Sequence, residues 1–326
     1  MVPQLGVPIR QRAQGALDGD STQRSGIVGT SSWGPTNTAI AAADISDCKA
    51  AFGAKQAKTT DIGTAVSIAQ TQGASSFRLV RVTDGTDTAA QVVLGGVSIT
   101  AKYTGTTGNA LSATLTQQGT SSTYTLVTSH ATLGSLVYTG TSWNEIQAAV
   151  LADANATVVL SLSEAASGAV TQAGAAVTLN GYVVTLGSVA LTPGSVTLSG
   201  GTDGGTPTAG QFIGADDTDA RTGMYALRNQ GCALGFIHGL SDVSTASTQA
   251  VFGLGEGIYM IATGPSGDTI ANAIAMSASA GYASYGLKMM HGDWLYYTDD
   301  TNGTMLVPPQ AFVAGRLASL APSESG

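Results

Sequence analysis

The feature that most constrains the fold is a long stretch almost without charge in the middle of the chain. Between Thr88 and Trp143 the only charged residue is Lys102. The segments here are rich in Val, Leu, Thr and Tyr, and Gly, Ser and Asn separate them at spacings typical of hairpins. This pattern continues to about residue 200, so we expect residues 91–200 to form a β-rich domain.

One helix is expected to interrupt this β-rich stretch. Ser142 fits the N-cap position, and Trp143, Ile146 and Val150 follow at helical spacing. Glu145 stands at the third helical position, where it would complete a capping box with Ser142.

The residues before this stretch alternate between strand and helix patterns. We expect a short strand at 25–30 and a strand at 77–82. Between them, one helix should begin after Asp44 and end at Gly53, and a second should begin at Thr60 or Asp61 and end near residue 73. A strand, two helices and a strand within about 60 residues indicate an α/β layer.

The residues after 200 return to an α/β pattern. They predict a helix–turn–helix stretch at 208–229, strands at 233–237, 259–262, 288–290, 293–297 and 305–307, and helices at 244–254, 267–281 and 310–319. We therefore expect a multidomain α+β or α/β fold. Its α/β core would comprise residues 25–90 and 201–326, with the barrel- or sandwich-like domain 91–200 inserted and an extended arm at 1–24.

The composition indicates a surface that other protein covers. Charged residues make up 10% of the 326 residues, where about 25% is usual for soluble domains. Such a weakly polar surface fits a self-associating protein better than a free monomer. The net charge of −8, with scattered Lys and Arg, argues against binding nucleic acid, which needs concentrated basic residues.

The sequence offers no segment for export or for crossing a membrane. The first 20 residues contain no apolar core of a secretory signal. The longest uncharged run, 165–202, is broken throughout by Gly, Ser, Thr, Asn and Pro, which is typical of strands and turns. We therefore expect neither a signal peptide nor a membrane helix.

The residue types that carry acid–base chemistry are few and poorly placed. Of the three histidines, His130 lies in a Ser/Thr-rich strand and His291 in a turn. His238 is followed by Ser241 and Asp242, but three residues this close on one loop cannot form a triad in which the base bridges nucleophile and acid. We interpret them as a polar cluster that bonds its own turn.

Other candidate sites fail on spacing. Cys48 and Cys232 are far apart and are expected to be buried free thiols. The glycines of 253–257 lack dinucleotide-binding spacing, those of 264–269 lack the P-loop lysine, and the acidic residues of 216–219 lack the alternation of a calcium loop. We therefore predict no catalytic, cofactor-binding or metal-binding residue and no cofactor, which indicates that the chain is not an enzyme. A hydrolase using Ser241 or His238 is the enzymatic alternative, and a secreted β-rich adhesin or surface-layer module is the alternative of another class.

Four segments in order along the chain resemble the tail sheath proteins of contractile phages and related injection machines. They are 26–35 (GIVGTSSWGP) with the helix end 51–53 (AFG), 99–109 (ITAKYTGTTGN), 198–205 (LSGGTDGG) through 221–227 (RTGMYAL) to 236–240 (FIHGL), and 306–315 (LVPPQAFVAG). His238 stands where the family commonly has proline. Arg316 also departs from the family's pattern, which often has an aromatic or small residue there.

The resemblance implies a structural subunit with no catalytic centre. Such subunits polymerise around a tail tube, and the sheath contracts to drive the tube through the host envelope. The implied partners are further copies of the chain in stacked hexameric rings, the tail tube protein, and the baseplate and tail terminator proteins, without nucleic acid or direct membrane insertion. The implied location is the virion, after assembly in the host bacterial cytoplasm; a bacteriocin-like or type VI secretion-like machine is the alternative.

The end of the chain departs from the family. Sheath sequences usually continue well beyond the segment that matches 314–320, into a further α/β portion and an extended arm. We therefore expect that this chain lacks the C-terminal portion.

Overall fold

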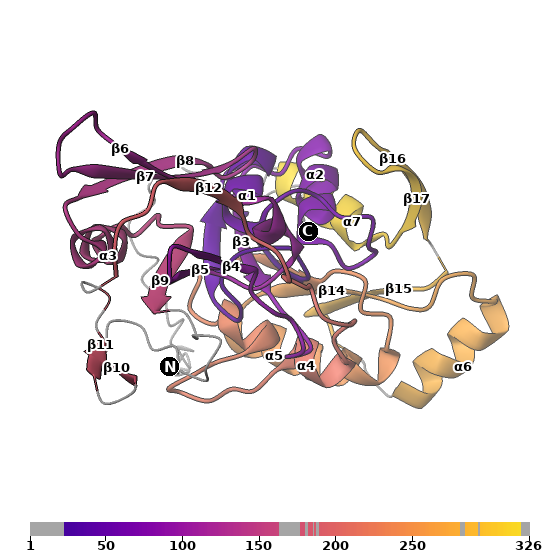
Figure 1. Ribbon diagram of the computed structural model, residues 1–326. Helices are drawn as coiled ribbons and strands as arrows, with labels where there is room; N and C mark the ends of the chain where they lie inside the picture. Colours follow the sequence, from indigo (N-terminus) through magenta and orange to yellow (C-terminus); the bar gives the residue numbers. More distant parts are fainter. Residues whose placement is uncertain are drawn as a thin grey trace, which may run out of the picture.

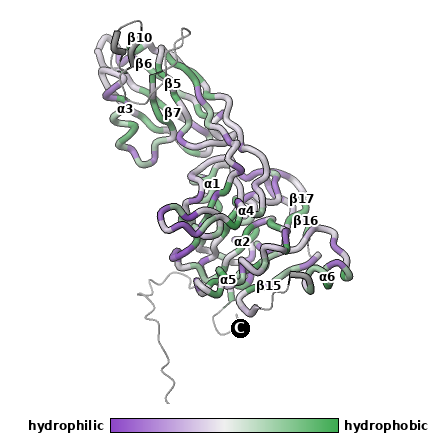
Figure 2. The backbone as a smooth tube through the Cα atoms, turned by 90° about the horizontal axis from the view of Figure 1, so that it is seen from below, coloured by the Kyte–Doolittle hydropathy of each residue, from purple (hydrophilic) through white to green (hydrophobic). Residues whose placement is uncertain are grey.

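The computed structural model describes residues 23–162, 177–179, 182–184, 186, 189–280, 284–292 and 294–320. It is a mixed α/β structure that contains several sheets (Figure 1). The β-rich elements lie at one end of an elongated molecule, and the helices α1, α2 and α5 lie with their sheet toward the other end (Figure 2). The expected arm 1–24 falls almost entirely outside the described residues.

The largest sheet has six strands in the order β15-β14-β13-β1-β3-β2. In chain order these are β1 (Ser25–Gly29), β2 (Ala39–Ala42), β3 (Phe77–Arg81), β13 (Leu234–Ile237), β14 (Tyr259–Thr263) and β15 (Leu287–Met290). All pairs are parallel except β2–β3 at one edge. β1 and β13 lie side by side, with Ile27 opposite Phe236, although about 200 residues separate them in sequence.

Helices cover both faces of this sheet. One face packs against α1 (Ile45–Phe52), α2 (Ile62–Thr71) and α7 (Gln310–Ser319), and its core includes Phe52, Phe77 and Phe236. The other face packs against α4 (Ala209–Ile213), the 3-10 helix η3 (Gly223–Leu227) and α5 (Ala246–Glu256). Because both faces are buried, β1 and β13 are buried throughout their length.

The expected helix ends of the first zone are confirmed. Asp44 is the N-cap of α1 and accepts hydrogen bonds from the backbone N–H groups of Ser46 and Asp47. Gly53 follows α1 with φ of 83°, a conformation that glycine adopts without strain. Asp61 is the N-cap of α2 and accepts from Thr64.

The residues between 91 and 197 form separate sheets. One has the order β4-β5-β9, with β4 (Gln91–Leu94), β5 (Val97–Ala101) and β9 (Val158–Leu162), and the other has the order β12-β6-β7-β8, with β6 (Ser112–Gln117), β7 (Tyr124–His130), β8 (Gly134–Gly140) and β12 (Gly194–Thr197). The 3-10 helix η1 (Thr106–Ala110) links β5 to β6, and a small hairpin pairs β10 (Val177–Leu179) with β11 (Tyr182–Val184). Helix α3 (Trp143–Ala152) buries Trp143, Ile146 and Val150 in a core shared with these sheets. The β-rich expectation is thus confirmed, and the domain boundaries stay a prediction.

Two local expectations differ from the structure. Ser142 caps α3 as predicted, but the carboxylate of Glu145 accepts from N–H and Oγ1 of Thr141, one residue earlier than a capping box requires. The stretch 208–229 is not a helix–turn–helix, because it contains only the five-residue α4 and the 3-10 helix η3.

The last third of the chain contains an exposed helix and a β-hairpin. Helix α6 (Ile270–Ala280) precedes β15, and β16 (Leu295–Asp299) pairs with β17 (Gly303–Val307). The buried ammonium group of Lys55 binds Asp299 at 2.6 Å and also binds Asp300, which ties the hairpin turn to the loop after α1. No helix among the described residues is long and apolar enough to cross a membrane.

Helix α7 is held in place by side-chain hydrogen bonds of its first residue and by close packing. The side chain of Gln310 donates to the carbonyl oxygen of Ile237 at 2.9 Å and accepts from the N–H of Gly239. Farther along α7, Gly315 packs so tightly on α2 that a β-carbon there would lie 2.4 Å from the carbonyl oxygen of Ala69. The sheath-like segment 306–315 therefore serves to dock α7 on the sheet and on α2.

We expect Gly315→Ala to destabilise the protein by about 1–3 kcal/mol, because the added methyl group forces α7 away from α2. Gly255→Ala on α5 is the matched control, since nothing lies within 4 Å of its β-carbon position. There we expect stabilisation of about 0.5–1 kcal/mol. Urea unfolding followed by circular dichroism measures both, and equal effects would contradict the packing argument.

Candidate functional site at the junction of the sheets

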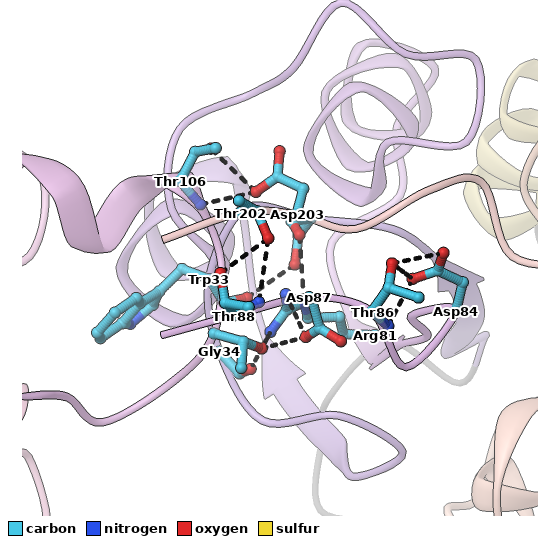
Figure 3. A network of polar contacts seen from close by, with 12 residues as sticks. Trp33, Gly34, Arg81, Asp84, Thr86, Asp87, Thr88, Thr106, Thr202 and Asp203 are labelled. Carbon is cyan, nitrogen blue, oxygen red and sulfur yellow. Dashed lines mark hydrogen bonds and ion pairs between the residues drawn. The ribbon is translucent and has the colours of Figure 1, made fainter. Parts of the chain in front are cut away.

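The chain passes between the six-stranded sheet and the β-rich sheets twice, and the two passages lie side by side (Figure 3). The outgoing segment follows β3 and the returning segment follows β12. Thr88 and Thr202 exchange two backbone hydrogen bonds of 3.1 Å, and Gln91 and Ser199 exchange two more. The two segments are therefore joined like a short piece of antiparallel sheet.

Arg81, the last residue of β3, lies at the centre of this junction with its side chain fully buried. Its Nε donates to the carbonyl oxygen of Ser31 at 3.1 Å, and its Nη1 donates to that of Gly34 at 2.8 Å. The carboxylate of Asp87 lies 3.5 Å from Nη2, and Thr104 bridges by accepting from Nη1 and donating to Asp87. A buried guanidinium group is tolerated only with such a set of acceptors.

Asp203, on the returning segment, binds two other parts of the chain. Its Oδ1 accepts from the N–H and the hydroxyl group of Thr106 at 2.8 and 2.9 Å. Its Oδ2 accepts from Gln56 at 2.5 Å and from Lys58 at 3.1 Å. One carboxylate thus joins the loop after α1, the segment after β5 and the segment after β12.

The surroundings of the junction favour the ionised form of Asp203 and oppose that of Arg81. Burial raises the pKa of Asp203, but the hydrogen bonds from Thr106, Gln56 and Lys58 outweigh it, so that this pKa lies below the ordinary value. Burial lowers the pKa of Arg81, and the charges of Asp87 and Asp203 oppose this. The network therefore depends on ionised carboxylates.

Two glycines let the backbones meet at the junction. A β-carbon on Gly105, whose φ is 122°, would lie 2.1 Å from the carbonyl oxygen of Ser32. A β-carbon on Gly201 would lie 2.5 Å from the carbonyl oxygen of Gly105. Asn109 closes this contact, because its side-chain amide both donates to and accepts from the backbone of Gly201.

Trp33 extends the junction into the core of the β-rich sheets. It is 3% exposed, belongs to their hydrophobic cluster and meets Tyr103 edge to face with 5.3 Å between ring centroids. The neighbouring Ser32 shares a hydrogen bond of 2.7 Å with Thr107. The loop after β1 is thereby packed into both sheet systems.

Three of the sheath-like segments meet at this one place. The turn at 31–35, the segment 104–109 and the turn 200–205 supply its glycines, its hydroxyl groups and Asp203. No functional role was assigned to Asp203, Arg81 or Asp87 from the sequence alone. The signal for Arg81 was available, since it stands in a buried strand where an unpaired charge would be costly.

The histidines considered for chemistry are dispersed. His238 is fully buried, neither of its ring nitrogens has a hydrogen-bond partner, and burial lowers its pKa to about 3. Asp242 instead caps the following turn by accepting from Ser244. The interpretation as a polar loop cluster is therefore right for Asp242 and wrong for His238. His130 accepts from the backbone of its own turn, and His291 shares a hydrogen bond of 2.9 Å with Ser277.

The other rejected motifs also have structural positions. Asp216 pairs with Arg221 and Arg228, and residues 253–257 form the last turn of α5 and its C-cap, Gly257. Cys48 and Cys232 are free and buried, as predicted. Within the described ranges, no group of three or more His, Cys, Asp or Glu residues is placed to hold a metal ion.

Two solved structures resemble this one along most of the chain. A sheath tail protein from Desulfitobacterium hafniense has a TM-score of 0.57 at 16% identity, and the match covers 96% of this chain and 62% of that protein. A sheath tail protein Lin1278 from Listeria innocua has a TM-score of 0.57 at 16% identity, covering 92% of this chain and 57% of that protein. The chain has the fold of tail sheath proteins.

The expected resemblance is thus confirmed at the level of the fold, although the sequence alone is too divergent for a match. No model of a protein family matches the sequence, and no curated protein is significantly similar to it. The chain spans about 60% of the length of these two sheath proteins.

The junction predicts a large effect for a single isosteric change in this sheath fold. Asp203→Asn keeps one oxygen but loses the charge that Lys58 pairs with, so we expect a loss of about 1–3 kcal/mol of stability. Asp217→Asn is the control, because that carboxylate only accepts from a neighbouring backbone N–H and should change stability by less than about 0.5 kcal/mol. Similar urea midpoints for the two variants would contradict the assigned role.

The same carboxylate predicts a pH dependence. The folded pKa of Asp203 is lowered, so its contribution is present above the unfolded value of about 3.9 and is lost as pH falls through the folded pKa. The stability difference between wild type and Asp203→Asn should therefore stay constant from pH 8 to 5 and shrink below pH 4. Urea unfolding of both proteins at each pH measures it, and a difference that is as large at pH 3 as at pH 7 would exclude this explanation.

Proposed function

We propose that the chain is a structural subunit of a contractile tail sheath, which polymerises around a tail tube. The observation that carries the proposal is the shared fold with two sheath tail proteins over 96% and 92% of the chain. It is supported by the sheath-like segments, which build the junction and the seat of α7 in this structure. We also propose that residues 91–200 are a domain inserted into the α/β core 25–90 and 201–326.

In this function the chain acts through its contacts with other subunits. Copies would stack as hexameric rings around the tube, with baseplate and terminator proteins at the ends, in a virion assembled in the bacterial cytoplasm. Contraction would drive the tube through the host envelope and eject the genome. A contact that is better satisfied after contraction by a few kcal/mol per subunit suffices when many subunits move together.

The polar network supports this function better than a catalytic one. Its carboxylates and its guanidinium group are engaged with the chain's own backbone and side chains. An enzyme site needs polar groups that face a substrate, whereas a subunit that carries load needs its two sheet systems firmly joined. We therefore interpret the junction as a mechanical element.

Electron microscopy of the full-length protein expressed alone tests the proposal. We expect tubes or stacked rings, and strictly monomeric particles at high concentration would overturn it. Deletion of residues 1–20, most of the proposed arm 1–24, should leave the fold intact by circular dichroism and weaken polymerisation, because such arms can join neighbours by adding strands to a sheet edge. Undiminished assembly of the deletion variant would remove the arm from this role.

A further inference from the structure

The four-stranded sheet ends on an edge strand without the usual protection. In the order β12-β6-β7-β8, β8 is terminal and seven residues long. Among the described residues, no strand or isolated bridge pairs with its outer edge. Proteins normally protect such an edge with charges, proline or a bulge, but β8 (GSLVYTG) has no charge and no proline, and its register with β7 is continuous.

Other edges of the molecule differ from β8. At the ends of the six-stranded sheet, β2 has only four residues and β15 carries Lys288. Beside β4, the bridge between Gln91 and Ser199 occupies part of the edge. The terminal strands β9, β12 and β17 are uncharged as well, but they have five residues or fewer, so β8 with seven is the longest terminal strand among the described residues.

The outer face of the same sheet is also uncharged. The residues that point outward are Thr197, Ser112, Ser129 and Ser135 in one row, Ser195, Thr114, Val127 and Val137 in the next, and Thr116, Thr125 and Thr139 in the third. Val137 is 62% exposed, whereas its neighbour Tyr138 points into the core and is 5% exposed. Hydroxyl groups both donate and accept, as the 2.7 Å contact between Ser129 and Ser135 shows.

We propose that β8 is a self-pairing edge, where β8 of one copy adds antiparallel to β8 of a second copy. A second copy can meet this edge although each chain has a net charge of −8, because β8 carries no charge and salt screens charges that lie farther than about 10 Å from the contact. It is also favoured by symmetry, since an antiparallel strand pair has a two-fold axis. The two four-stranded sheets then become one sheet of eight strands.

The middle residue of β8 lies on the axis of this pair. Val137 is the centre of Gly134–Gly140, so in the central register it faces Val137 of the second copy. Directly opposite residues of an antiparallel pair have β-carbons about 5 Å apart. Pairing through one seven-residue strand buries less than the roughly 800 Å² per partner of a stable interface, so we expect a dissociation constant of about 10–100 µM.

The pair lies outside the proposed sheath lattice. A two-fold contact joins copies that point in opposite directions, whereas the subunits of a tail, whose two ends differ, all point the same way. The self-paired form is therefore a state of the free subunit, and it goes beyond the proposed function.

Charge variants at Val137 test the pairing by sedimentation velocity between 5 and 200 µM. Wild type should dimerise, and Val137→Lys and Val137→Glu should each dimerise at least tenfold more weakly, because like charges then face each other. An equimolar mixture of the two variants should regain the dimer. Val93→Lys is the control, since Val93 is 54% exposed on β4 and its substitution should not change the dissociation constant.

A second measurement uses cross-linking. Val137→Cys should form a disulfide-linked dimer under mild oxidation, while Val93→Cys should not, and the native thiols are buried.

A wild type that is monomeric at 200 µM, or a mixture of the charge variants that stays monomeric, overturns self-pairing and assigns the edge to a different partner. Val137→Lys should still form sheath tubes; loss of tubes would place β8 in the lattice and overturn the pairing as a free-subunit state. A dimer without tubes would contradict the sheath function alone.

Discussion

The buried guanidinium group of Arg81 is the interaction on which the connection between the sheets depends. It stands where β3 ends, and its acceptors come from the loop after β1, from the segment between β3 and β4 and from the segment after β5. Each acceptor must stay in place, because water cannot reach the buried guanidinium group to replace a lost hydrogen-bond acceptor. The positions of Trp33, Asp87 and Thr104 are therefore mutually fixed, and the glycines that allow their backbones to approach are fixed with them.

Several carboxylates of this chain that are buried or that cap helices are used for hydrogen bonds within the molecule. Asp203 accepts four hydrogen bonds from its own chain, and Asp61 and Asp44 cap helices. The hydrogen bonds to Asp203 lower its pKa, whereas burial raises the pKa of Asp61 to about 7. His238 completes the contrast, since it is neutral and fully buried and its ring nitrogens have no hydrogen-bond partner.

Local signals predicted the elements well, and long-range contacts account for what was missed. Asp44, Gly53 and Asp61 determine helix ends through bonds to residues two to four positions away, so the sequence shows them directly. The 3-10 helix η3 is different, because Gly223 needs a φ of 55° to fit against the backbone of Gly214. The junction was missed for the same reason: Arg81 and Asp203 are more than 100 residues apart, and only the folded chain brings their partners together.

The many small residues of this chain serve close packing inside the molecule as well as a surface that other protein would cover. At Gly105, Gly201 and Gly315 the small residues serve close backbone contacts inside the molecule. These contacts leave no room for the two sheet systems to slide, because the backbones at Gly105 and Ser32 already touch: a methyl group on Gly105 would lie only 2.1 Å from the carbonyl oxygen of Ser32. We therefore expect a displacement applied to the β-rich sheets to be transmitted to the six-stranded sheet, as the proposed function in a contractile sheath would require.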